Sequence, residues 1–325
     1  MSTIPALPDH APPLTRNRSF TQRLRAGEEL AYLITLTAAA AIFLITALVL
    51  YELFVQSALT RNKLGWGFLI SSTWDPVAGV FGALPFIYGT VVTSALALLI
   101  AVPQGIGAAI FLAEMAPPRV SNALTFLIEL LAAVPSVIYG LIGVFVLVPI
   151  LQKDVVPPLK AVFGALPIFK GTFYGVSYFS AAIVLSVMIV PFIISVSREV
   201  LISVPRDQRE ASLALGASKW QTTWSVVVPN AAKGIAGSIF LALARALGET
   251  MAVTMVIGNT PKISPSLLAP GYSIAAVIAN EFTEATGDLY LSALIELGLV
   301  LFGVTFILNG LARILILTTE QRGAH

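Results

Sequence analysis

The sequence predicts an all-α polytopic membrane protein with six transmembrane helices, and three observations lead to this fold class. Hydrophobic residues make up 57% of the 325 residues and charged residues only 11%, whereas soluble proteins carry about 25% charged residues. The mean hydropathy is +0.89. The apolar residues are gathered in long blocks, and a helix needs about 20 of them to cross a bilayer. The blocks predict spans at about 30–54, 87–113, 123–151, 179–201, 234–258 and 291–317.

Composition also argues against several functional classes. The sequence contains no cysteine, which excludes disulfides, zinc–thiolate sites and cysteine nucleophiles. Its two histidines are His10 and His325, so neither a histidine metal site nor a Ser-His-Asp triad is expected in the core. A net charge of +2 gives no sign of a nucleic-acid partner. We therefore expect no metal or other cofactor in this chain, and membrane lipid as its surroundings.

The first element is polar and proline-rich, and residues 1–29 are expected to form a cytoplasmic tail. The apolar run 30–54 that follows is longer than the roughly 7–15 apolar residues of a signal peptide, so it should remain in the membrane as the first helix. Residues 55–86 are then expected to form an external loop, and residues 87–317 a transmembrane domain of five helices. A second cytoplasmic tail is expected at 318–325.

The basic residues predict the orientation, because cytoplasmic segments of membrane proteins carry an excess of Lys and Arg. With the N-terminus inside, twelve of the 19 basic residues fall in cytoplasmic segments and six in external segments. The remaining one, Arg245, lies inside a span. Both termini are therefore predicted to be cytoplasmic.

The cytoplasmic segment 202–233, between the fourth and fifth spans, has the most informative pattern. Asp207 can cap a helix whose first turn holds Glu210, and Gly216 would permit a sharp turn after it. A second short helix would then run towards Pro229. By pattern alone this segment is either a solvated amphipathic loop or a docking helix that fits a groove on a cytoplasmic partner.

A resemblance favours the docking interpretation. Glu210-Ala211-Ser212, then Gly216 after three residues, then Val226-x-Val228-Pro229 after nine more, resembles the EAA loop of ABC-importer permeases. The family pattern reads EAA, three residues, G, nine residues, I-x-L-P, so this chain departs from it at Ser212, Val226 and Val228 but keeps the spacing. The resemblance implies a type I ABC-importer permease fold and a loop that couples to an ATP-hydrolysing subunit. The coupling role carries over to Glu210, Ala211, Gly216, Ala217 and Pro229.

The chain itself lacks the sequence G-x-x-x-x-G-K-[ST], so it has no P-loop to hold nucleotide phosphates. Under the resemblance, ATP and Mg²⁺ would be bound by the partner ATPase. We therefore expect a transporter subunit and not an enzyme.

The fifth span carries two charges, Arg245 and Glu249, which are four residues apart and would share one helix face. A charge at mid-bilayer costs about 2.5–3.5 kcal/mol on insertion scales, so this face should look towards water or protein. The two side chains either merely neutralise one another, or Arg245 meets a translocating anion while Glu249 holds the guanidinium. Beside this face lies a ridge of small residues that would allow close helix packing: Gly234, Ser238, Ala242, Ala246, Thr250 and Thr254.

Two further carboxyl groups, Glu129 and Glu296, also fall inside predicted spans. Each is a candidate for lining a translocation path, for pairing with Arg245, or for being protonated. The pattern leaves these alternatives open.

Other stretches resemble the PstC-type permeases of phosphate ABC importers. They are Trp74-Asp75-Pro76, Phe81–Pro85 with Tyr88-Gly89-Thr90, Glu129–Ala132 followed by Pro135–Gly140, and Arg245–Asn259. The run Met251–Val256 favours this type over its sister permease. The resemblance implies an importer in the prokaryotic inner membrane, in which this chain works with a second, PstA-like permease, a dimer of PstB-like ATPases and an external PstS-like phosphate-binding protein. Helices of both permeases would enclose the path.

Three alternatives stay open at this level. The same EAA loop would suit a permease for another oxyanion, such as sulfate or molybdate. A proton-coupled secondary transporter would use Glu129, Glu249 and Glu296 as carriers, although no internal repeat of the kind such transporters often show is visible. A membrane-embedded enzyme would need a nucleophile–base pair or a metal constellation, and the sequence offers neither.

Overall fold

The computed structural model describes the backbone of residues 28–323 and the side chains of residues 30–314. Of the two expected tails, 1–29 and 318–325, residues 1–27 and 324–325 lie outside the described part. The chain divides into two units, residues 1–52 and residues 53–325. Each unit is described by itself.

Six helical stretches in the described residues are long and apolar enough to cross a membrane, which confirms the predicted fold class. They are Leu30–Gln56, Leu84–Met115, Ser136–Phe163, Tyr178–Ser203, Lys219–Leu247 and Asp288–Ile314. The first stretch belongs to helix α2, Glu28–Gln56. Large apolar side chains of α2 such as Phe43 are exposed, and lipid or another membrane helix would cover such a surface.

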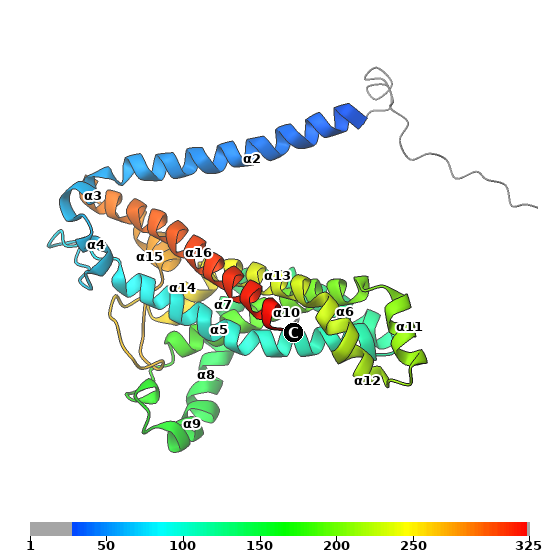
Figure 1. The fold of residues 1–325 in the computed structure, drawn as a ribbon. Helices are drawn as coiled ribbons and strands as arrows, with labels where there is room; N and C mark the ends of the chain where they lie inside the picture. Colours follow the sequence, from blue (N-terminus) through cyan, green and yellow to red (C-terminus); the bar gives the residue numbers. More distant parts are fainter. Residues whose placement is uncertain (1–27, 324–325) are drawn as a thin grey trace, which may run out of the picture. The chain divides into compact units, whose positions relative to one another are not determined.

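The second unit is built from helices, some joined by short turns and others by longer loops, such as those between α9 and α10 and between α14 and α15 (Figure 1). Two short helices, α3 (Ala58–Leu64) and α4 (Gly67–Ile70), fall in the segment expected as an external loop. The following helices are α5 (Leu84–Ile110), α6 (Pro118–Ala132), α7 (Ser136–Ile142), α8 (Val148–Ile150), α9 (Val156–Phe163), α10 (Tyr178–Ser203), α11 (Arg206–Ala214), α12 (Lys219–Thr222), α13 (Val228–Leu247), α14 (Met251–Ile257), α15 (Ile274–Glu281) and α16 (Asp288–Gly323). A 3₁₀ turn, η4, covers Pro167–Phe169.

Helix α10 is the most buried of the six candidate spans. It packs against α5, α6, α13 and α14, and the main cluster of buried apolar side chains forms around Leu185 and Ile189. Its start is fixed by Ser177, whose Oγ accepts a hydrogen bond from Ser180 N at 3.1 Å. Figure 1 shows α11 and α12 at one end of this bundle and α3 and α4 at the other.

The contact between α10 and α13 confirms the expected ridge of small residues from Gly234 to Ala246. A Cβ at Gly234 would lie 2.2 Å from Cγ1 of Val200 on α10, so only glycine fits there. One turn further, Ser238 and Ser197 are both fully buried and their Oγ atoms lie 2.7 Å apart. Small side chains thus let the two helices approach closely.

The expected continuous span 123–151 is wrong, because the helix breaks at residues 133–135. Helix α6 ends at Ala132, and Pro135 takes extended backbone angles (φ −58°, ψ 140°) before α7 begins. Proline disfavours helical angles in the residue before it, and a helix commonly ends there. The expected span 234–258 is likewise interrupted, between α13 and α14.

Four described segments widen into π-helix, and each ends two residues before a proline. They are η1 (Phe111–Met115), η2 (Gly143–Leu147), η3 (Leu151–Val155) and η5 (Thr223–Val227), followed by Pro117, Pro149, Pro157 and Pro229. In η5, Val228 N donates to Thr223 O five residues back. Proline cannot donate to the carbonyl four residues back and its ring clashes with it, so the extra residue makes room for the rings of Pro149, Pro157 and Pro229, where the helix continues. Pro117 instead follows the end of its helix.

Next to α3 and α4, aromatic residues gather around one carboxylate. Glu281 Oε2 accepts hydrogen bonds from Trp74 Nε1 at 2.8 Å and from the Tyr290 hydroxyl at 2.7 Å. The neighbouring Tyr272 hydroxyl accepts a hydrogen bond from Asn280. Burial raises the pKa of the Tyr272 hydroxyl to about 12, so this group stays neutral at physiological pH.

Candidate functional site

Arg245 lies in the last turn of α13, and its side chain is exposed. The helix ends at Leu247 with Gly248 as its C-cap. The expected helical pairing with Glu249 is therefore wrong, because Glu249 lies beyond the end of the helix. Within residues 30–314, no hydrogen bond or ion pair holds the Arg245 side chain. Its charge acts electrostatically on the Tyr139 hydroxyl.

Glu249 stabilises the start of α14 instead. Its Oε1 accepts a hydrogen bond from Ala252 N at 3.1 Å, and such first-turn N–H groups have no partner inside their own helix. A carboxylate beside a helix N-terminus is also favoured by the helix dipole. Glu249 therefore helps to fix the break between α13 and α14.

Glu129 lies on α6, close to the break before α7, and its side chain is exposed. At this break Leu131 O accepts a hydrogen bond from Val134 N at 3.1 Å and a second one from the Tyr139 hydroxyl at 2.7 Å. Unpaired carbonyl groups at membrane depth are costly, so these two bonds help the helix to break there.

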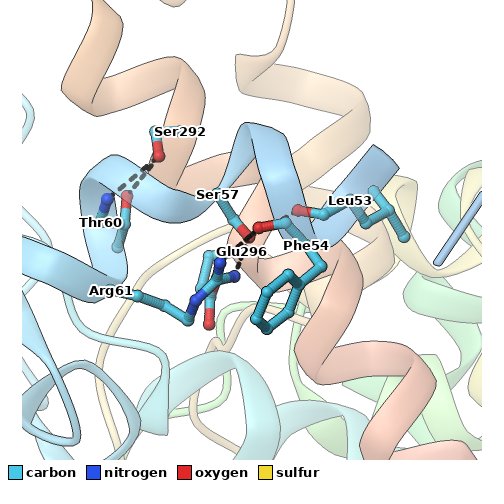
Figure 2. A network of polar contacts seen from close by, with 7 residues as sticks. All are labelled: Leu53, Phe54, Ser57, Thr60, Arg61, Ser292 and Glu296. Carbon is cyan, nitrogen blue, oxygen red and sulfur yellow. Dashed lines mark hydrogen bonds and ion pairs between the residues drawn. The ribbon is translucent and has the colours of Figure 1, made fainter. Parts of the chain in front are cut away.

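Glu296 has a partner that the sequence did not suggest. Its Oε2 lies 3.2 Å from Nη1 of Arg61 on α3, and the two side chains are 11% and 26% exposed. Arg61 Nη1 also donates to Ser57 Oγ at 2.6 Å, and its Nη2 donates to the Phe54 carbonyl. Figure 2 shows these groups converging on the guanidinium, which stacks 3.7 Å from the centre of the Phe54 ring.

A second contact ties α3 to α16 beside this pair. Ser292 Oγ accepts hydrogen bonds from Thr60 N at 3.1 Å and from Thr60 Oγ1 at 2.9 Å (Figure 2). A pocket of about 300 Å³ lies next to the ion pair and is lined by Arg61, Gly65, Trp66, Phe68, Leu69 and Glu296. Of the alternatives left open for Glu296, pairing with Arg245 is excluded in this structure because Arg61 occupies the carboxylate.

The segment expected to dock a partner forms two short helices joined by a tight turn. Helix α11 ends in a Schellman motif, in which Gly216 N donates to Leu213 O at 3.0 Å and Ala217 N donates to Ser212 O at 3.2 Å. Gly216 has a φ of +89°, which L side chains rarely adopt, so the expected sharp turn is confirmed. The expected cap by Asp207 is wrong, because α11 begins earlier, after Pro205.

Helix α12 starts with a capping box, in which Gln221 N donates to Ser218 Oγ and Ser218 N donates to Gln221 Oε1. A hydrogen bond of 3.0 Å between Ser212 Oγ and Thr222 Oγ1 ties α11 to α12. Helix α12 continues through η5 into α13, so Pro229 lies inside one continuous helical rod.

The surface of this segment is exposed and partly apolar. Glu210, Ala211 and Gly216 are exposed, and Ala217 is half-buried. Exposed large apolar side chains lie among them: Leu213, Leu215, Trp220 and Trp224. Leu215 is 90% exposed, and such contiguous apolar exposure marks surfaces that another protein covers.

Arg209, which the sequence pattern did not single out, fastens α11 to the rest of the unit. Its Nη2 donates to Glu114 Oε1 at 2.9 Å and to Leu201 O at 2.7 Å, and its Nη1 donates to Val204 O at 2.5 Å. The signal that could have found it is an acidic residue, Glu114, at the same predicted membrane face as the segment 202–233. Nothing in the spacing pairs the two.

Within the described side chains, no group of three or more His, Asp or Glu residues is placed to hold a metal ion. The candidate sites of this chain are a set of charged side chains near helix breaks and the exposed, partly apolar segment at α11 and α12.

The chain belongs to the family of binding-protein-dependent transport system inner membrane components, which it matches over residues 105–319. It is thus an inner-membrane transporter component.

Its relatives with curated names include the phosphate transport system permease protein PstC of Mesorhizobium japonicum, 45% identical over 98% of each chain. The protein of the same name from Xylella fastidiosa is 47% identical over 79% of this chain and 81% of the relative. A probable PstC of Methanocaldococcus jannaschii is 35% identical over 85% of this chain and 90% of the relative.

Solved structures agree with the fold. A chain of a bacterial ABC transporter that imports the acidic polysaccharide alginate is 18% identical, with a TM-score of 0.55 over 90% of this chain and 98% of that chain. A chain of a bacterial alginate ABC transporter in complex with a pentasaccharide-bound periplasmic protein has a TM-score of 0.56, over 92% of this chain and 98% of that chain, at 16% identity. The predicted ABC-importer permease fold is confirmed.

Proposed function

We propose that this chain is the permease subunit of an ATP-driven importer for inorganic phosphate. The observation that carries the proposal is its similarity along 98% of its length to a permease named for phosphate transport. The exposed Arg245 supports the same substrate, because a guanidinium offers two parallel donors that match a pair of phosphate oxygens.

Arg245 is proposed to contact the anion as it passes. An exposed charge within the spans needs water, a polar partner or a substrate beside it, and a second permease that encloses the path would supply those surroundings. We propose that three carboxylates also belong to the path, each in a different role: Glu249, Glu129 and Glu296. Glu249 holds the break next to Arg245, Glu129 lies exposed at the neighbouring break, and Glu296 orients Arg61.

Partners are proposed from the same features. A PstA-like second permease would complete the path, a PstB-like ATPase dimer would bind ATP and Mg²⁺, and a PstS-like protein would deliver phosphate from outside. The chain has no P-loop of its own. The ATPase would dock on the exposed segment that carries Glu210, Ala211, Gly216, Ala217 and Pro229, which is then cytoplasmic together with both termini.

The test is uptake of radiolabelled phosphate and sulfate by cells that lack their own phosphate importers. The cells express this chain with its candidate second permease, ATPase and binding protein. Phosphate uptake that needs an active ATPase is the expected result. Sulfate uptake without phosphate uptake would show that sulfate is the substrate, while the proposed assembly with an ATPase would still stand. Uptake that persists with a catalytically dead ATPase would overturn the ATP-driven mechanism in favour of a secondary transporter.

A further inference from the structure

We propose that Arg209 is a positioning residue that transmits movement of the docking helix α11 to the ends of α5 and α10. The inference rests on the proposed function, in which a partner ATPase docks on α11. One guanidinium joins three segments here: α11 through its own backbone, α10 through two carbonyl groups, and η1 through Glu114.

These contacts are largely shielded from solvent, so they are expected to hold α11 firmly against the membrane unit. The Arg209 side chain is 18% exposed and that of Glu114 is 13% exposed. Charge-assisted hydrogen bonds of this kind are about twice as strong as neutral ones. By contrast, Glu210 and Arg206, which flank Arg209 on α11, are exposed. Arg209 is therefore the residue of this helix that faces the membrane unit.

The two carbonyl groups belong to the C-terminal end of α10, where the last carbonyls lack the usual donor four residues on, although Leu201 O also accepts a hydrogen bond from the cap residue Val204 at 3.3 Å. Only Pro205 separates Val204 from the start of α11. The covalent link therefore already ties α11 to α10. What Arg209 adds is an attachment to η1, which continues directly from α5.

The end of α5 is held from a second side as well. Ser121 Oγ on α6 donates to Leu112 O of η1 at 2.8 Å, and Arg198 Nη2 on α10 donates to Ser121 Oγ at 3.4 Å. The π-helical end of α5 is thus clamped between α6, α10 and α11. If a docked partner displaces α11, the Arg209–Glu114 ion pair would pull the end of α5 with it. Helix α11 would not have to change its own conformation.

The test uses the assembled importer in proteoliposomes, with ATP hydrolysis and phosphate uptake measured on the same samples. Arg209→Gln keeps the aliphatic part of the side chain but loses the charge and the terminal Nη donors that make all three contacts. We expect ATPase to co-purify at normal stoichiometry and to hydrolyse ATP, while phosphate taken up per ATP falls about tenfold. Arg209→Lys should recover part of the ratio, because an ammonium can still reach Glu114. Arg119→Ala, an exposed arginine on α6, is the control with an unchanged ratio.

A second variant separates positioning from folding. Glu114→Gln leaves both carbonyl contacts of Arg209 in place, and it should lower uptake per ATP in the same way. The double variant Glu114→Gln/Arg209→Gln should be no worse than the poorer single variant, because both act through one bond. An unchanged ratio in Glu114→Gln, or additive losses in the double variant, would overturn the proposal. A wild-type assembly that takes up no phosphate would instead refute the proposed function.

Discussion

Glu296 on α16 and Arg61 on α3 form an ion pair of 3.2 Å although 235 residues separate them in the sequence. The pair closes one end of the membrane unit, where Thr60 and Ser292 add a second link. The guanidinium contacts three residues there, Glu296, Ser57 and Phe54, so the carboxylate is one part of a network.

Loss of the Glu296 carboxylate should destabilise the protein. Glu296→Ala leaves a largely enclosed guanidinium without its counter-charge, which should cost about 1.5–3 kcal/mol. The measurement is thermal unfolding of the purified protein in detergent. Glu199→Gln is the matched control, because the Arg198–Glu199 pair has a carboxylate that is 70% exposed, and such pairs contribute about 0–1 kcal/mol. Equal effects of the two changes would contradict a structural role for the Arg61–Glu296 pair.

Arg245→Gln should abolish phosphate uptake while the complex still assembles, because the amide has neither the charge nor the two parallel donors of a guanidinium. Uptake and co-purification of the partner subunits are measured together. Arg245→Lys should retain a fraction of the uptake, since it keeps the charge but not the fork. Normal uptake in the glutamine variant would remove Arg245 from the path.

Glu249→Gln should impair uptake less than Arg245→Gln does. The amide oxygen can still accept the hydrogen bond from Ala252 N, so the start of α14 is kept. The same uptake assay compares both variants at equal expression. A defect as large as that of Arg245→Gln would mean that the charge of Glu249, and not its capping bond, is what transport requires.

Gly216→Val should weaken ATPase binding, because a β-branched residue at a φ of +89° strains the turn by about 1–3 kcal/mol. The measurement is the amount of ATPase that co-purifies with the permease. Gly237→Ala is the control, since Gly237 lies inside α13 and an added Cβ meets no atom within 4 Å. If Gly216→Val retains the ATPase fully, docking does not depend on this turn.

Gly234→Ala should destabilise the α10–α13 contact by about 1–3 kcal/mol, because the new Cβ would overlap Cγ1 of Val200. The double variant Gly234→Ala/Val200→Ala removes the overlapping methyl groups and should regain part of the loss. Thermal unfolding in detergent of the two single variants and the double variant gives the coupling. Additive losses would show that the two residues do not contact each other in the folded protein.

The number of spans and the turn at Gly216 could be predicted from the sequence because both depend on local composition and backbone preference. The apolar blocks determine where helices cross the membrane, and Gly216 determines where the segment 202–233 turns. The breaks at Pro135 and Gly248 were missed, since apolar residues continue on both sides and hydropathy cannot register a change of direction. The partners of Glu296 and Arg209 were missed for another reason. Each pairing joins residues far apart in sequence and depends on how the helices pack.

The π-helix η5 has a consequence for how α12 is oriented relative to Arg245. Each added residue in a helical ladder turns the following part by about 100° around the axis. The side of the rod that carries Trp220 therefore cannot be found by counting 3.6 residues per turn back from Arg245. Deleting one residue of η5 would keep the exposed side chains of α11 and α12 but would rotate them about the helix axis. They would then point in another direction relative to Arg245. Where a π-helical turn precedes a proline, the spacing of residues in the sequence no longer gives the direction in which their side chains point.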